Sequence, residues 1–433
     1  MTSASSIDTA PTTDPGRTQA IASDGSLTAF YRDMNTRERR TFWACFWGYA
    51  LDALDYMVYP LVVGTLIALW KVDRSMAGLA VTGTLLASAC GGWLAGYAAD
   101  RIGRVKTLQL TVIWFSAMSL LCAFAQDFVQ LSVARALLGF GFGGEWAAGA
   151  VLIGETIRAQ YRGRAVGTVQ SAWAVGWGAA VMLQALAFTL LPPEQAWRAM
   201  FAVGALPAVL LIYIRRNVEE PAVSLRERSA AGAKGPSMLE IFRPKVLRTT
   251  VLAALFATGC QGGYYAITTW VPTYLTTERH LTVVGSTGYL AFLIAGSFTG
   301  YLVGAWMADR FGRKPLFITF AVGAMALVVA YTQLPIPAQA MMLLGFPLGF
   351  FASGYFAGVG AFLTELFPTA LRGSGQGFCY SFGRGIGAVF PALVGYFSQF
   401  SSLAFAISMF AVVAYGLLLV SIMFLPETRG RVL

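Results

Sequence analysis

The sequence predicts an all-α membrane protein in which twelve transmembrane helices form two pseudo-symmetric bundles of six. The first observation is composition: the 433 residues are 57% hydrophobic and only 12% charged, whereas a soluble domain carries about 25% charged residues. The second is that apolar stretches of about 20 residues, the length that crosses a bilayer, recur along nearly the whole chain. The third is a pair of motifs that repeats about half a chain apart.

These stretches divide the chain into five segments. Residues 1–40 begin as a Ser-, Thr-, Ala- and Asp-rich stretch, and we expect a partly disordered cytoplasmic tail. A six-helix bundle at 41–214, a cytoplasmic linker at 215–247, a second bundle at 248–425 and a cytoplasmic tail at 426–433 follow. The predicted spans are 42–69, 77–98, 107–125, 129–154, 165–190, 197–214, 248–275, 285–307, 315–333, 338–361, 374–397 and 402–425.

Lysine and arginine positions set the orientation. Most of the 31 basic residues lie in the two tails, the linker and the alternate loops on the same side of the predicted bundle. The positive-inside rule places that side in the cytoplasm. The loops on the other side hold only Lys71, Arg74, Arg198 and Arg279. We therefore predict a multi-pass protein of a bacterial-type inner membrane with both termini in the cytoplasm. The net charge of +10 is then a topology signal and not a sign of nucleic-acid binding.

The internal repeat supports two related bundles. "DRIGR" at 100–104 matches "DRFGR" at 309–313, and "ETIRAQYRGRAVG" at 155–167 matches "ELFPTALRGSGQG" at 365–377. The two offsets differ by a single residue, and each motif follows the second or the fourth span of its half. A duplicated six-helix unit is the economical explanation.

Ionisable residues inside the spans are the candidate functional groups. Asp52 and Asp55 lie three residues apart in the first span, so they share a helix face. In the fourth span, Arg135 lies in the outer third and Glu145 near the midplane, because a ten-residue step covers about 15 Å. Such groups face a partner or a water-filled cavity and are functional by default.

The buried charges do not balance. Arg384 in the eleventh span is the second buried arginine, so three acids face two arginines. One alternative is a purely structural pair of Asp55 with Arg135. It leaves a surplus carboxyl group, which burial and like charge should keep protonated. A protonatable acid beside a cavity is what proton coupling needs.

Other chemistry finds little support. The five cysteines show no ligand-like spacing, and His280 is the only histidine, so we expect no metal centre, no disulfide framework and no cofactor. "GFGFGGEW" at 139–146 mimics a dinucleotide fingerprint, but it lies within a membrane helix, where close helix packing explains the glycines better.

Several motifs together resemble the major facilitator superfamily of transporters. "GYAADRIGRVK" (96–106) is similar to the signature between its second and third helices, and "AWMADRFGRK" (305–314) to the weaker second copy. "RALLGFG" (135–141) resembles its helix-4 motif and "LPETRG" (425–430) a common ending. The resemblance implies the major facilitator fold. It also implies an inner-face latch that forms in one state of the transporter, although an ordinary basic loop remains an alternative. The latch residues would be Asp100, Arg101, Arg104, Glu155, Arg162, Asp309, Arg310, Arg313, Glu365 and Arg372.

"GYALDALDY" beside "GFGGEW" resembles the sialate:proton and aromatic-acid:proton symporter families, whose first helix carries an Asp-Gly-x-Asp motif. By that resemblance Asp52 and Asp55 are transport-essential acids, with Ala53 in place of the family glycine. Aromatic and amide side chains could shape a pocket, and we single out Gln261, Tyr264 and Trp173 beside the two arginines.

We therefore expect a symporter, not an enzyme, that imports a small organic acid anion with protons. Asp52, Asp55 and Glu145 would carry protons, and Arg135 and Arg384 would meet the substrate carboxylate. The partners would be the acid, protons and the lipid bilayer, and the protein would act as a monomer. One alternative is an efflux pump or uniporter for a neutral or cationic solute, in which the buried acids are counter-ions. Another is a membrane sensor on the same scaffold.

Overall fold

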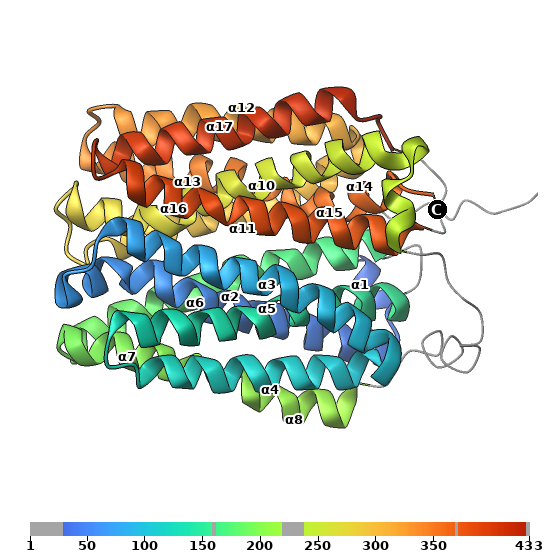
Figure 1. Ribbon diagram of the computed structural model, residues 1–433, viewed down its shortest axis with the longest axis horizontal. Coiled ribbons are helices and arrows are strands. Elements are labelled where there is room, and N and C mark those ends of the chain that lie inside the picture. The colour runs from blue at the N-terminus through green and yellow to red at the C-terminus, as the bar shows by residue number, and fades with distance from the viewer. Residues whose placement is uncertain (1–28, 158–161, 219–237, 369–370, 430–433) are drawn as a thin grey trace, which may run out of the picture.

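The computed structural model describes residues 29–157, 162–218, 238–368 and 371–429. At some positions within these ranges it describes the backbone but not the side chain. The helices run along the long axis of the molecule, with the N-terminal half (blue to green) beside the C-terminal half (yellow to red) (Figure 1). Eight of the described helices are long and apolar enough to cross a membrane.

Most spans are single helices. A short α1 (Ala29–Asp33) precedes the first span, and η1 (Met238–Phe242) precedes the seventh. The unbroken spans are α2 (Thr36–Trp70), α3 (Arg74–Ile102), α4 (Arg104–Ala123), α5 (Phe128–Thr156), α6 (Arg162–Leu190), α10 (Pro244–Thr277), α11 (Thr287–Arg310), α12 (Arg313–Gln333) and α17 (Leu403–Phe424). The first span starts at Thr36, inside the stretch expected to be tail, because Asn35 and Glu38 form a capping box there.

Three of the expected spans are interrupted. They are α7 (Pro193–Val203) with α8 (Pro207–Asn217), α13 (Ala338–Gly354) with α14 (Phe356–Glu365), and α15 (Arg372–Gly387) with α16 (Val389–Phe397). Pro207 starts α8, and a proline there has no N–H to donate to the preceding helix. Pro391 likewise removes the hydrogen bond to Gly387, the last residue of α15.

The two halves use the same internal packing. α3 packs on α5 in the first half, and α11 packs on α13 in the second. Both contacts need glycine: a Cβ on Gly143 would collide with the carbonyl oxygen of Ser88, and one on Gly349 with that of Leu293. This explains the glycine run of the fourth span as close helix packing. Gly103 and Gly312, in the two repeated motifs, also share a positive φ, 107° and 112°.

The halves meet through α2 against α10, α3 against α15 and α16, and α6 against α11. We call the end that carries the α2–α3 and α10–α11 connections the outer end, and the opposite one the inner end. The contact is tight toward the outer end. Thr82 Oγ1 donates to the Ala388 carbonyl at 2.6 Å, and a Cβ on Gly78 would meet the backbone of Pro391 and Ala392. The halves are therefore joined there without room for a channel between α3 and α16.

Candidate functional site

All five ionisable side chains predicted for the interior of the spans are buried, with exposed fractions between 1% and 6%. α2 carries Asp52 and Asp55, α5 carries Arg135 and Glu145, and α15 carries Arg384. They separate into two groups. Asp55 and Arg135 lie inside the N-terminal half, and Asp52 and Glu145 lie near Arg384, where the halves meet. Neither group is a simple row of ion pairs.

The group inside the N-terminal half contains Asp55 and Arg135. The Ser119 hydroxyl of α4 hydrogen-bonds Asp55 Oδ1, and its oxygen also lies 3.1 Å from the carbonyl oxygen of Phe201 in α7. The Arg135 guanidinium lies 5.1 Å from the centre of the Tyr59 ring and 5.9 Å from that of Phe201. The ring faces therefore provide part of its stabilisation as cation–π contacts.

The structural pair of Asp55 with Arg135 does not form as a direct ion pair. Arg135 acts on Asp55 through its charge, but among the described residues no N···O contact of 4.0 Å or less joins them. Arg135 Nε and Nη1 are buried and have no acceptor among those residues. Because a buried charge without hydrogen-bond partners is costly, this arginine needs an acceptor that the described side chains do not supply.

Asp52 and Glu145 form an acid pair between α2 and α5. Their carboxyl groups are neighbours, close enough to share a proton. No N–H or O–H group of the described residues donates to either oxygen of Asp52 or to Glu145 Oε2. Two carboxyl groups hydrogen-bond only when one of them holds a proton. The pair can therefore hold a proton in the interior of the protein.

Arg384 lies at the meeting of the two halves. Its Nη1 donates to Ser88 Oγ of α3 at 2.9 Å, which joins the C-terminal half to the N-terminal half. Its guanidinium lies 5.2 Å from the centre of the Phe142 ring and 5.1 Å from that of Tyr380. Arg384 also acts on Asp52 through its charge. The arginine is thus held between aromatic faces, next to the acid pair.

Aromatic side chains from both halves lie around Arg384 and the acid pair. Trp173 Nε1 of α6 donates to the Tyr264 hydroxyl of α10 at 2.6 Å, a second bond between the halves. Tyr56 stacks on Phe142, with ring centres 5.4 Å apart, and lies 5.7 Å from Trp173. Tyr265 contacts Tyr56 across the interface, at 6.2 Å. We call Tyr56, Phe142, Trp173, Tyr264 and Tyr265 the aromatic cluster.

Gln261 holds Tyr265 of the aromatic cluster in place through hydrogen bonds. Its Nε2 donates to the Tyr380 carbonyl at 3.0 Å, and its Oε1 accepts from the Tyr265 hydroxyl at 3.0 Å. The sequence-predicted residues Gln261, Tyr264 and Trp173 therefore come together. Ser88, Ser119 and Phe142 were missed, because single small or apolar residues in a membrane helix carry no spacing signal that links them to a charge on another helix.

The predicted latch is described only for its second copy. Arg313 pairs with Glu365 at 2.9 Å and with Asp309 at 3.1 Å, and Arg310 lies over the Trp306 ring. Arg372 Nε has no partner among the described residues. The ion pairs of Arg313 lie within the C-terminal half. The side chains of Asp100, Arg101, Arg104, Glu155 and Arg162 lie outside the described part of the chain.

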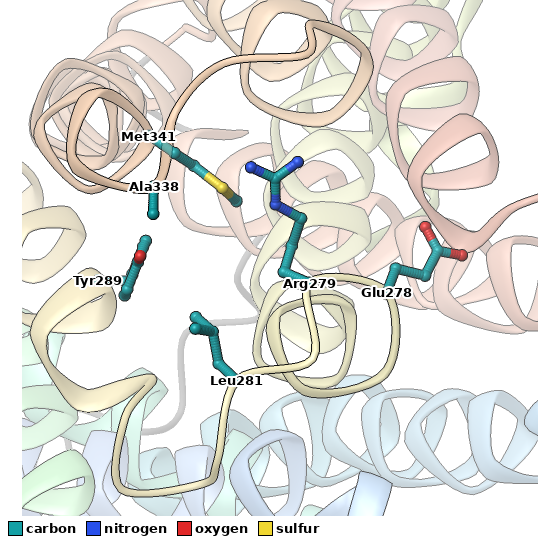
Figure 2. Close-up of a pocket in the computed structure, with 6 residues that line it drawn as sticks. All are labelled: Glu278, Arg279, Leu281, Tyr289, Ala338 and Met341. Carbon is teal, nitrogen blue, oxygen red and sulfur yellow. The ribbon is translucent and has the colours of Figure 1, made fainter.

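A pocket of about 240 Å³ lies at the outer end of the C-terminal half, away from the buried charges, lined by Glu278, Arg279, Leu281, Tyr289, Ala338 and Met341 (Figure 2). Both charged residues are used in the fold. Glu278 accepts the backbone N–H groups of Leu403 and Ala404 at the start of α17, and Arg279 donates to the Ile336 carbonyl. Fixed in this way, they brace the loops of the outer end.

Comparison with known proteins agrees with this architecture. A relative from Cupriavidus pinatubonensis named a probable 4-methylmuconolactone transporter is 40% identical over 93% of this chain and 94% of its own. The cis,cis-muconate transport protein of Acinetobacter baylyi is 30% identical over 82% and 86%. The fold is similar to that of the xylose transporter of E. coli in a partially occluded inward-open conformation. That match has a TM-score of 0.67 and 19% identity, covering 92% of this chain and all of that one.

The family assignment follows from the sequence match. Residues 45–337 and 290–432 match the Major Facilitator Superfamily, which confirms the resemblance seen in the repeated motifs. The protein is a multi-pass membrane transporter and not an enzyme. It belongs to the Major Facilitator Superfamily.

Proposed function

We propose that this protein is a proton-coupled symporter that imports a small organic acid anion across a bacterial-type inner membrane by alternating access. The bundles 41–214 and 248–425, joined by the linker 215–247, tilt about the layer of buried charges. Both termini lie in the cytoplasm, and a monomer is sufficient. The inner-end residues chosen as a latch hold one of the two end states.

The observation that carries the proposal is the surplus of buried acid. In the middle of the described spans, Asp52, Asp55 and Glu145 are buried together with Arg135 and Arg384, so that the acids outnumber the bases. A charge in a membrane interior is costly unless it is paired or neutralised. The acid pair of Asp52 and Glu145 meets this requirement by keeping a proton, which an arriving substrate and the adjacent Arg384 can help to release.

The substrate class is supported by Arg384 and the aromatic cluster. A guanidinium matches a carboxylate with two parallel hydrogen bonds, and Arg384 lies between the faces of Phe142 and Tyr380. Aromatic faces favour a flat, conjugated body. The names of the two curated relatives refer to a muconolactone and a muconate. The candidates are a monocarboxylate, an aromatic acid or its ring-cleavage product, and sialate, with the flat acids favoured.

Uptake into proteoliposomes tests the proposal. The proteoliposomes have an acidic pH outside and a neutral pH inside. The radiolabelled compounds offered are cis,cis-muconate, a muconolactone, benzoate, lactate and sialate. We expect one of the flat acids to accumulate above its outside concentration and a protonophore to abolish that accumulation. Asp55→Asn and Arg384→Ala should each prevent it. An exposed arginine of the same half, Arg248, gives the matched control Arg248→Ala.

The rival functions give different results. For an efflux pump or uniporter of a neutral or cationic solute, the buried acids would be the counter-ions of the solute. Arg384→Ala would then leave transport intact, while Asp55→Asn would not. A sensor would bind a ligand and move nothing. Intact uptake in both variants would exclude the symport mechanism.

A further inference from the structure

We propose that Ser119 is a positioning residue that couples the protonation state of Asp55 to the backbone conformation at the break between α7 and α8. This inference rests on the proposed proton symport. It assigns a role to a neutral residue of α4 that the buried charges alone do not explain. It also gives a reason why the sixth span is interrupted beside an acid of the first.

The hydrogen-bond geometry gives Ser119 two acceptors for one proton. Its hydroxyl hydrogen-bonds Asp55 Oδ1, and its oxygen lies 3.1 Å from the Phe201 carbonyl oxygen. A serine hydroxyl has a single proton to donate but can also accept. Ser119 can therefore satisfy only one of the two oxygens as a donor at any moment.

The Phe201 carbonyl depends on this serine because the helix breaks there. In a regular helix it would accept from the N–H of residue 205, but the Ala205 N–H donates to Ala202 instead. The break also touches the acid directly, since a Cβ on Gly204 would collide with Asp55 Oδ1 and Ser119 Oγ. Gly204 is thus the residue that lets the interrupted helix approach Asp55.

The two protonation states of Asp55 place the protons differently. When Asp55 is ionised, Ser119 donates to it, and the Phe201 carbonyl loses its donor. When Asp55 is protonated, its O–H donates to Ser119, which frees the serine proton for the Phe201 carbonyl. An unpaired buried carbonyl disfavours the interrupted form, and shifts the equilibrium away from it by about 5- to 150-fold. Loading the acid therefore favours the interrupted form of the sixth span.

Other charged and titratable groups around Asp55 do not duplicate this connection. Arg135 of α5, Asp52 of its own helix and Cys122 of α4 act on it or respond to it through charge. Arg135 also reaches α7, but through the ring face of Phe201 at 5.9 Å and not through a hydrogen bond to its backbone. Among the described side chains, Ser119 is the one that hydrogen-bonds both Asp55 and the Phe201 carbonyl.

The test separates coupled from uncoupled transport in proteoliposomes, using the radiolabelled acid that the wild type accumulates. Ser119→Ala should lower pH-driven accumulation about tenfold or more while exchange at equal pH stays within about threefold of wild type. Ser119→Thr, which keeps the hydroxyl, should restore accumulation. Ser116→Ala is the matched control, because Ser116 is buried on the same helix. In an Asp55→Asn background, Ser119→Ala should add little, since the two act as one unit.

The outcomes separate this inference from the function it rests on. If the wild type does not respond to the pH gradient, the symport proposal fails and takes this inference with it. If the wild type is coupled to the pH gradient and Ser119→Ala has the same ratio of accumulation to exchange as the wild type, the positioning role alone is overturned. An equal loss of accumulation and exchange that threonine does not restore would show a merely structural serine, and would overturn it too.

Discussion

The two halves share a fold but differ in where their charges lie. Besides Glu38 at the inner end of α2, the described spans of the N-terminal half bury four acidic or basic side chains, Asp52, Asp55, Arg135 and Glu145. The described spans of the C-terminal half bury one, Arg384, and otherwise rely on neutral bonds such as that of Tyr355 to the Cys260 carbonyl. Its ion pairs gather instead at the inner end, around Arg313.

This difference shows what the duplicated unit keeps and what it changes. The close approach of α3 to α5 and of α11 to α13 is kept, with a glycine against a backbone carbonyl in each half. The buried charged side chains differ between the halves, as expected when a site is placed on a shared scaffold. We infer that proton chemistry resides in the first half and that the second supplies Arg384 as an anion receptor.

The largest effect should come from breaking what the halves share. Gly143→Val and Gly349→Val place a side chain against a backbone carbonyl of the neighbouring helix. Overpacking costs about 1–3 kcal/mol or more, and backbone cannot yield as a side chain can. We expect both variants to lose about 3 kcal/mol or more, seen as lost folded protein in detergent chromatography. Gly83→Ala and Gly416→Ala, where nothing lies within 4 Å, are the controls. A large loss in only one half would contradict equivalent packing.

The second prediction concerns what the halves do not share. Glu145→Gln keeps a hydrogen-bonding group beside Asp52 but removes the acid. We expect pH-driven accumulation of the radiolabelled acid to fall about tenfold or more, equivalent to about 1.4 kcal/mol, with exchange retained. Gln261→Ala should instead lower both, because it removes the support of Tyr265. If both variants showed the same pattern, the division of roles between the halves would be wrong.

The sequence predicted the scaffold better than the site. Apolar length and two repeated motifs were enough for the spans, since these signals come from many residues. The breaks at residues 204–206, Tyr355 and Ala388 were missed, because average hydropathy does not report a lost backbone hydrogen bond; Pro207 and Pro391 were the available clues. The alternative that paired Asp55 with Arg135 named two groups that do interact through charge, but Ser119 and Phe201, which lie on other helices, could not be found from spacing.

The third prediction tests a bond that joins the halves. Trp173→Phe removes the donor to Tyr264, and a neutral hydrogen bond is worth about 0.5–1.5 kcal/mol. We expect a change of about two- to twelvefold in the transport rate. Trp177→Phe is a close control, because Trp177 lies one turn away and its Nε1 has no partner among the described residues. Tyr264→Phe should show a similar effect that does not add to that of Trp173→Phe; full additivity would mean that the bond does not govern the rate.

The smallest effect belongs to the inner end of the C-terminal half. Glu427 accepts the N–H groups of Arg313 and Lys314, where α12 begins. Burial would raise the pKa of Glu427, but backbone N–H groups from Arg313, Lys314, Arg429 and Thr428 outweigh it and lower the pKa. The contribution to stability is therefore complete above the unfolded pKa of about 4.3 and is lost as the pH falls through the lower, folded value.

Glu427→Gln measures this contribution. We expect it to lower stability at neutral pH by about 0.5–1 kcal/mol, the low end of a helix cap because the residue is exposed. In thermal melting, the difference from wild type should shrink as the pH falls below about 4.3. Glu240→Gln, in an exposed pair with Arg243, serves as the control. A difference that stayed constant down to acid pH would mean that the tail is held by Thr428 and its bond to Glu365, and not by the charge of Glu427.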